Sequence, residues 1–69
     1  MMNKEKAFDR AIKRAKQCNE SFYIVLDDPK WGEYAVANEL ELDTYYLGCQ
    51  VIATVDPDGM IYSNDIHGG

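Results

Sequence analysis

The sequence predicts one α+β domain: an N-terminal amphipathic helix packed on an antiparallel sheet of about four strands, with a short helix or turn before the last two. Three observations support this prediction. Apolar residues recur at helical spacing over residues 3–18, two β-rich runs follow within residues 21–38, and a β-rich region divided by a turn covers residues 49–64. With 69 residues, the chain is long enough for one domain. We expect this domain to cover residues 1–64 and a flexible polar tail to cover residues 65–69.

The first helix is expected over residues 3–18. Its apolar side chains recur at steps of three and four residues and would form one face against the sheet. Asn3 suits the N-cap, and Asn19 tolerates the left-handed conformation that ends a helix. The small alanines of this face would let the helix approach the sheet closely. The face consists of Ala7, Phe8, Ala11, Ile12, Ala15 and Cys18.

Two strands are expected next, at residues 21–26 and 33–38. The first contains five consecutive apolar residues, which indicates a central strand covered on both faces. The second alternates large and small residues and would pair with the first, although its two alanines also tolerate a helix. The intervening loop holds Asp27, Asp28 and Trp31. Trp31 would either close one end of the core or anchor a partner, because tryptophan is common at binding hot spots.

Residues 38–48 predict a short helix, with a tight irregular turn as the alternative. Asn38 can cap the helix, and Glu41 stands three residues later, where its side chain can reach back to the cap. The helix would continue through residue 47 and end at the glycine that follows. Tyr45 and Tyr46 are adjacent and cannot share a helix face, so we expect one to pack and the other to reach solvent.

The last two strands are predicted to form a hairpin over residues 49–64, around the turn Asp56-Pro57-Asp58-Gly59. With a three-residue loop, Val55 would oppose Ile61 and Thr54 would oppose Tyr62. One face is expected to join the core, and the other, also apolar, to pack on the second helix or on another subunit. The expected core face consists of Val51, Ala53, Val55 and Ile61, and the second face of Ile52, Thr54, Met60 and Tyr62.

Charge is divided unevenly along the chain, whose net charge is −5. Residues 1–20 carry six cations and three carboxylates, a balance of +3, and residues 21–69 carry one cation and nine carboxylates, a balance of −8. The cationic helix is a candidate for nucleic-acid binding, but we expect a solvated face, because a negatively charged molecule opposes binding to phosphates. Its cations are Lys4, Lys6, Arg10, Lys13, Arg14 and Lys16.

Nothing in the sequence predicts a membrane or secretory segment. No apolar run approaches the roughly 18 residues of a membrane span, and the N-terminal residues do not have the composition of a signal peptide. We therefore expect a cytoplasmic location and no membrane partner. In that reducing compartment, Cys18 and Cys49 would be small buried hydrophobes, and their spacing fits neither a metal site nor a redox pair.

The residue types that carry catalysis form no recognisable pattern. His67, the one histidine, lies in the expected tail, where it lacks the fixed position that a general base needs. The turn of residues 56–59 is not followed by the acidic ligand of a calcium loop, so we expect no metal and no cofactor. Gly68-Gly69 is an ending shared with ubiquitin-like carrier proteins, but those folds begin with a hairpin and this chain begins with a helix. We predict that the protein is not an enzyme, and carrier function remains an alternative.

These observations favour a small acidic module that binds a partner protein with a basic surface. Carboxylates pair with arginine, and tyrosine adds contact area at low entropic cost. Phage anti-defence (anti-CRISPR-like) inhibitors offer an analogy of class, since small acidic proteins can occupy grooves meant for nucleic acid. The alternatives are a nucleic-acid regulator that uses the basic helix and a homodimer formed through the C-terminal hairpin. The expected partner-binding residues are Glu39, Glu41, Asp43, Tyr45 and Tyr46, with Trp31, Asp27 and Asp28 as a second patch.

Overall fold

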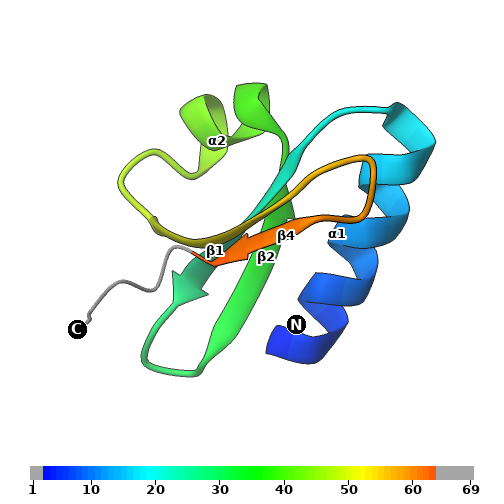
Figure 1. The fold of residues 1–69 in the computed structure, drawn as a ribbon. Coiled ribbons are helices and arrows are strands. Elements are labelled where there is room, and N and C mark those ends of the chain that lie inside the picture. The colour runs from blue at the N-terminus through cyan, green and yellow to red at the C-terminus, as the bar shows by residue number, and fades with distance from the viewer. Residues whose placement is uncertain (1–2, 64–69) are drawn as a thin grey trace.

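Six elements follow one another in the computed structural model, which describes residues 3–63 (Figure 1). Helices and strands come in the predicted order, so the α+β architecture is confirmed. The elements are α1 (Lys4–Cys18), β1 (Phe22–Asp28), β2 (Glu33–Ala37), α2 (Glu39–Tyr45), β3 (Gln50–Val55) and β4 (Ile61–Ser63).

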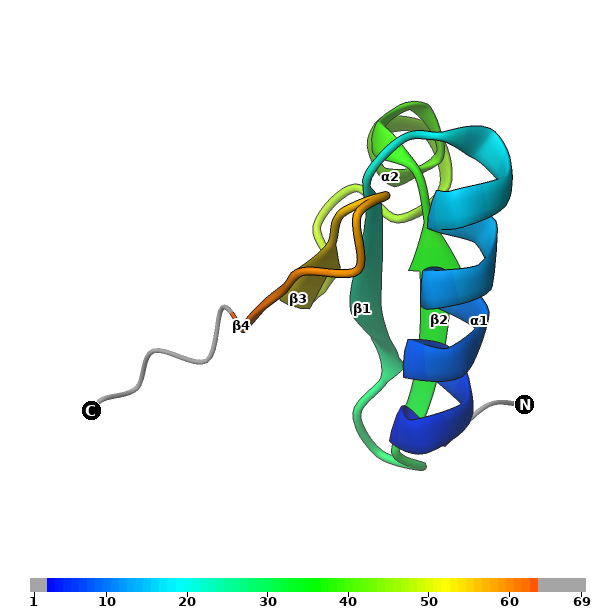
Figure 2. The same cartoon turned by 45° about the vertical axis from the view of Figure 1, so that its right-hand side comes forward.

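The four strands form one antiparallel sheet in the order β2-β1-β3-β4. α1 lies across one face of this sheet and contacts β1, β2 and β3. Figure 2 shows α1 beside β1 and β2, while β3 and β4 extend away from the helix. Among the described elements β4 contacts only β3, so neither helix covers this edge of the sheet.

The core lies between α1 and the sheet. Ala7, Ala11 and Ala15, spaced about one turn apart on α1, are fully buried, as the apolar periodicity predicts. Their small side chains let the helix approach the strands closely, and Phe8 and Ile12 of the helix pack at the margin of the core. The other fully or nearly fully buried residues of the core come from the sheet. These strand residues are Phe22, Ile24, Val36, Ala53 and Val55.

Both ends of α1 have the predicted caps. Asn3 Oδ1 accepts a hydrogen bond from Lys6 N at 2.9 Å, and Asn19 adopts the left-handed conformation with a φ of 55°. The prediction that Cys18 extends the buried face is wrong: its side chain is exposed, because it is the last helical residue before the chain turns away. Cys49 is half-buried, so neither cysteine is the buried hydrophobe expected from the sequence.

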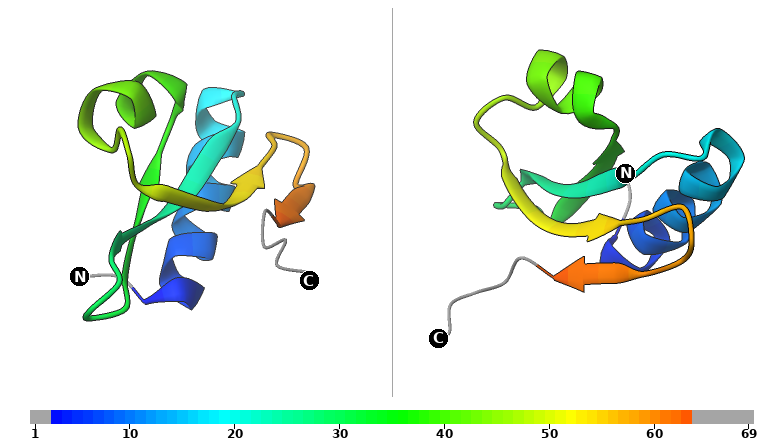
Figure 3. Two further views of the ribbon diagram at one scale, coloured as in Figure 1. Left: turned by 90° about the vertical axis from the view of Figure 1, so that its left-hand side faces the viewer. Right: turned by 45° about the horizontal axis from the view of Figure 1, so that its top comes forward.

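β1 is covered on both faces, as its run of apolar residues predicts. Ile24 faces α1 and Val25 faces away, because successive side chains alternate across a strand, and both are fully buried. Ala35 and Ala37 of β2 pair with Val25 and Tyr23, and both alanines are buried on that second face. α2 lies against β1 and β2 at the end of the sheet where β1 begins and β2 ends (Figure 3).

The hairpin of β3 and β4 has the predicted register. Val55 pairs with Ile61 and Thr54 with Tyr62, across the predicted three-residue loop. Gly59 has a φ of 93°, which is the conformation that the exit from this turn requires. Turn chemistry alone was therefore sufficient to predict how these two strands align.

The predicted faces of the hairpin are wrong at three positions. A β-bulge makes Ile52 an extra residue in β3, which turns Ile52 toward the core under α1 and Val51 toward the opposite face. Ile61 is exposed rather than buried, because α1 does not reach β4. The pairs on either side of the bulge are Ile24 with Ala53 and Val25 with Val51.

The predicted tail lies outside the described residues. This applies to residues 65–69, and with them to the expectations for His67 and for Gly68-Gly69. Within residues 3–63, neither helix has the length and apolar composition needed to cross a bilayer.

Candidate protein-interaction site

The first turn of α2 is closed by two local hydrogen bonds. Asn38 Oδ1 accepts from Glu41 N at 2.8 Å, and Asn38 N donates to Glu41 Oε1 at 3.0 Å. These two bonds are the predicted capping box, in which side chain and backbone satisfy each other reciprocally. The helix ends at Tyr45, two residues earlier than predicted, and Gly48 takes a positive φ of 93° in the loop that follows.

Most residues of α2 and of the loop after it are exposed. None of the seven residues described in α2 is buried. Glu39 and Asp43 are exposed, and this segment contains no cation, so the surface is anionic. Apolar groups lie on the same segment: Leu40, Tyr45 and Leu47 are 73%, 74% and 80% exposed. We name the exposed residues Glu39, Leu40, Asp43, Tyr45 and Leu47 the α2 surface. Glu39, Leu40 and Asp43 lie within about 100° of one another around the helix, whereas Tyr45 points to another side of it.

Leu40 and Leu47 are absent from the predicted site. A sequence signal could have identified Leu40, because Leu40 and Leu42 stand two positions apart in a helix. Helical residues turn by about 100° each, so the two leucines point about 200° apart and only one of them can face the sheet. Leu42 is half-buried and Leu40 faces solvent. An acidic surface with exposed leucines differs from the surface of carboxylates and tyrosines that the sequence predicts.

Glu41 and Tyr46 contribute less to this surface than predicted. The carboxylate of Glu41 is occupied by the capping box, and its Oε1 also lies 3.9 Å from the guanidinium of Arg14. Tyr46 is half-buried whereas Tyr45 reaches solvent, which is the division expected for adjacent tyrosines. Glu41 therefore caps α2 and also lies within ion-pair distance of Arg14 in α1.

The second predicted patch lies at the opposite end of the sheet. Trp31, in the turn between β1 and β2, is 71% exposed, so the interpretation that it closes the core is wrong. Asp27 is also exposed, but Asp28 Oδ1 accepts from Lys30 N at 3.1 Å and shapes the turn. Figures 1 and 2 both show this turn at the bottom of the sheet and α2 at the top. The eight predicted residues therefore form two separate surfaces.

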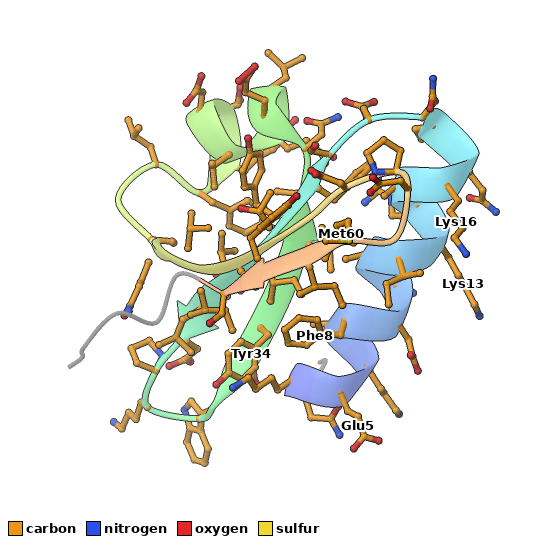
Figure 4. All side chains as sticks on the ribbon, viewed as in Figure 1. Glu5, Phe8, Lys13, Lys16, Tyr34 and Met60 are labelled. Atoms are coloured by element: carbon orange, nitrogen blue, oxygen red, sulfur yellow. The ribbon has the colours of Figure 1, made fainter. Side chains whose placement is uncertain are left out.

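The outer face of α1 is cationic. Lys13 and Lys16 point away from the body of the molecule (Figure 4). Arg14 instead covers the core: its guanidinium carbon lies 4.8 Å from the centre of the Phe22 ring. A hollow of about 400 Å³ on this face is formed by one helix alone. Its lining residues are Lys6, Asp9, Arg10, Lys13, Arg14 and Gln17.

A second hollow, of about 250 Å³, opens between the first turn of α1 and the sheet. Phe8 and Tyr34 lie together at this position (Figure 4), and Lys4 and Gln50 add polar groups at its rim. No carboxylate, histidine or cysteine is among the described residues that line this hollow. The remaining lining residues are Leu26, Ile52 and Ser63.

Within residues 3–63, no three His, Cys, Asp or Glu side chains gather in a position to hold a metal ion. Cys18 and Cys49 are both free. Comparisons of the chain with protein-family models, with curated proteins and with solved structures find no match. The candidate site therefore rests on the α2 surface itself.

Proposed function

We propose that this protein is a non-enzymatic binding module that docks the α2 surface on a basic surface of a partner protein. A basic surface that normally holds nucleic acid is the form of partner we favour, which would make the protein an inhibitor comparable with phage anti-defence proteins. The analogy is one of class, because acidic docking is a property of the site and not of the fold.

The observation that carries this proposal is the pairing of exposed carboxylates with exposed apolar groups on one short segment. Glu39 and Asp43 can form bidentate bonds with arginine, and Tyr45 offers a large side chain with few rotatable bonds. Leu40 and Leu47 would add apolar contacts at the centre of the interface. Solubility alone requires carboxylates but does not account for the exposed apolar groups beside them.

The test uses a partner captured from the host cell, identified and then purified, with binding measured by calorimetry. Glu39→Lys with Asp43→Lys is expected to weaken binding by at least about a hundredfold, since two charge pairs become repulsive. Glu5→Lys with Asp9→Lys is the matched control, because it makes the same change in net charge at two exposed helical positions. Glu41 is left intact, since its substitution would damage the capping box.

Two further results would bear on acidic docking. Binding should weaken as salt rises, because ions screen the exposed charges. Equal losses in the α2 variant and in the control would show that net charge matters and the α2 surface does not. Unchanged binding in the α2 variant would refute the proposal.

Trp31 and Asp27 are proposed as a secondary contact for the same partner or a second one. They lie at the far end of the sheet from α2, so they share no contact with the α2 surface. Trp31→Ala should therefore change affinity independently of Glu39→Lys, and the two effects should add.

Two other functions are each favoured by a specific observation. Lys13 and Lys16 point outward, which suits nucleic-acid binding by α1; a gel shift at low salt that Lys13→Glu with Lys16→Glu abolishes would support it.

Exposure of Met60, Ile61 and Tyr62 favours self-association through the C-terminal hairpin. We propose a cytoplasmic setting for all of these functions, in keeping with two free cysteines.

A further inference from the structure

The two edges of the sheet differ in how they are protected. β2 has three buried residues, and both helices lie against it. At the other edge, Met60, Ile61 and Tyr62 are 51%, 44% and 49% exposed, and β4 contacts only β3 among the described elements. Edge strands usually carry a charge, a proline or a bulge that prevents pairing with another chain. Residues 60–63 contain no charged residue and no proline, and β4 pairs with β3 without a register shift.

The backbone of Ile61 faces this open edge. In an antiparallel pair, residues that exchange hydrogen bonds with the partner strand alternate with residues whose N–H and C=O point the other way. Asp56 N donates to Met60 O at 2.9 Å, so Asp56 and Met60 form a hydrogen-bonded pair. The next pair along the strands, Val55 with Ile61, is therefore a non-hydrogen-bonded pair. The N–H and C=O of Ile61 therefore point away from β3.

We propose that two copies of this chain pair β4 with β4 in antiparallel orientation, about a two-fold axis that places Ile61 opposite Ile61 of the partner subunit. This inference rests on the self-association proposed above and specifies its geometry. Each Ile61 N–H donates to the Ile61 carbonyl oxygen of the partner subunit, which gives two reciprocal bonds. The two four-stranded sheets become one continuous sheet.

The sequence around β4 is complementary to itself in this register. Met60 lies opposite Tyr62 of the partner subunit, and the two-fold axis repeats the pair on the other side. A thioether next to an aromatic ring is a favourable contact. Because residues 60–63 are uncharged, the axis brings no like charges of the strand into opposition. A second copy of the chain is therefore the occupant that this edge fits.

The first test is the mass of the full chain, measured by sedimentation over a concentration series. We expect it to rise from that of one chain to that of two. Ile61→Pro removes the outward N–H while the bonds of β4 to β3 remain, since proline is tolerated on the open side of an edge strand. This variant should stay monomeric at every concentration. Ile61→Val keeps the N–H and the branched side chain, and should dimerise like the unchanged protein.

The second test examines the register and does not depend on tolerance of proline. Met60→Lys with Tyr62→Lys places like charges in opposition at both symmetric pairs, and should weaken the dimer by about tenfold or more. Met60→Lys with Tyr62→Glu places opposite charges there instead, and should restore the dimer.

A mass of one chain at every concentration would overturn both the pairing and the self-association. A dimer that survives Ile61→Pro, or one that does not respond to the sign of the charge at position 62, would overturn the β4 geometry and leave self-association through another surface. None of these substitutions alters the α2 surface. Failure of this inference is therefore distinguishable from failure of partner docking.

Discussion

The two helices begin in the same way and serve different purposes. Asn3 and Asn38 each accept a hydrogen bond from the backbone N–H three residues later, at 2.9 and 2.8 Å. α1 then continues for 15 residues and buries three alanines, whereas α2 has seven residues and buries none. The same capping chemistry thus supports one helix that builds the core and another that displays a surface. The comparison teaches that an N-cap sets where a helix begins and does not determine whether the helix is buried.

The charges of the helices follow the same division. α1 carries most of the cations of the chain, and α2 carries carboxylates and no cation. Acidic residues in the first turn of α2 also favour the helix itself, because they lie near the positive end of its dipole. Glu39 can therefore support the helix and remain free for a partner, while Glu41 is committed to the cap.

The largest difference between the two helices is expected when a carboxylate is introduced into each of them. Ala11→Asp should abolish folding, because it buries an unpaired charge at a cost of several kcal/mol in a small domain whose stability is about 5 kcal/mol. Leu40→Asp adds the same group to an exposed position and should change stability by no more than about 0.5 kcal/mol. Urea unfolding followed by circular dichroism measures both. A folded Ala11→Asp protein with an unchanged midpoint would mean that α1 does not pack as described.

Removing either N-cap should destabilise the protein less than Ala11→Asp does. The two removals should also differ, one acting on global unfolding and the other mainly on α2. Asn3→Ala should lower the free energy of global unfolding by about 1 kcal/mol, since α1 is part of the core. Asn38→Ala loses a comparable bond but should act mainly on α2, as faster amide hydrogen exchange in that helix, because α2 buries so little. Equal global losses in the two variants would argue that α2 is as integral to folding as α1.

The contact between the helices should contribute least. Glu41→Gln keeps an acceptor for Asn38 N and removes only the attraction to Arg14 across 3.9 Å. Both side chains are about one-third exposed, so a loss of no more than about 0.5 kcal/mol is expected. Glu41→Ala also removes the cap and should cost more. If the glutamine variant is as unstable as the alanine variant, charge pairing outweighs capping at this position.

Local features were predictable from the sequence, and tertiary features were not. Both N-caps and the pairing of Val55 with Ile61 depend on residues a few positions apart, and all are confirmed. The bulge at Ile52 depends on how β3 aligns with β1, about 28 positions earlier in the chain, and no local pattern predicts it. The exposure of Trp31 was equally invisible, because a large aromatic residue in a loop is compatible with both burial and display.

The predicted site shows the same limit. Residues of α2 can be selected because they are acidic and close in sequence, and Trp31 belongs to a second predicted patch. The sequence does not give the distance between the two patches, which lie at opposite ends of the sheet. The sequence predicts both capping and partner binding for Glu41, and its hydrogen bonds with Asn38 are those of the cap. The predicted site lacks Leu40 and Leu47, because a selection by charge and aromatic content does not include aliphatic residues.

Because of the bulge, Ile52 of β3 has no partner residue in β1. The strand can therefore lose this residue without a change in the pairing of its neighbours. Deleting Ile52 would leave Val51 opposite Val25 and Ala53 opposite Ile24, so the cost would be limited to the packing of one side chain. The same deletion at Ile24 in β1 would put that strand out of phase with both neighbours and turn its apolar residues to the wrong faces. Variation in length, which proteins usually confine to loops, is therefore tolerable at one position inside this sheet.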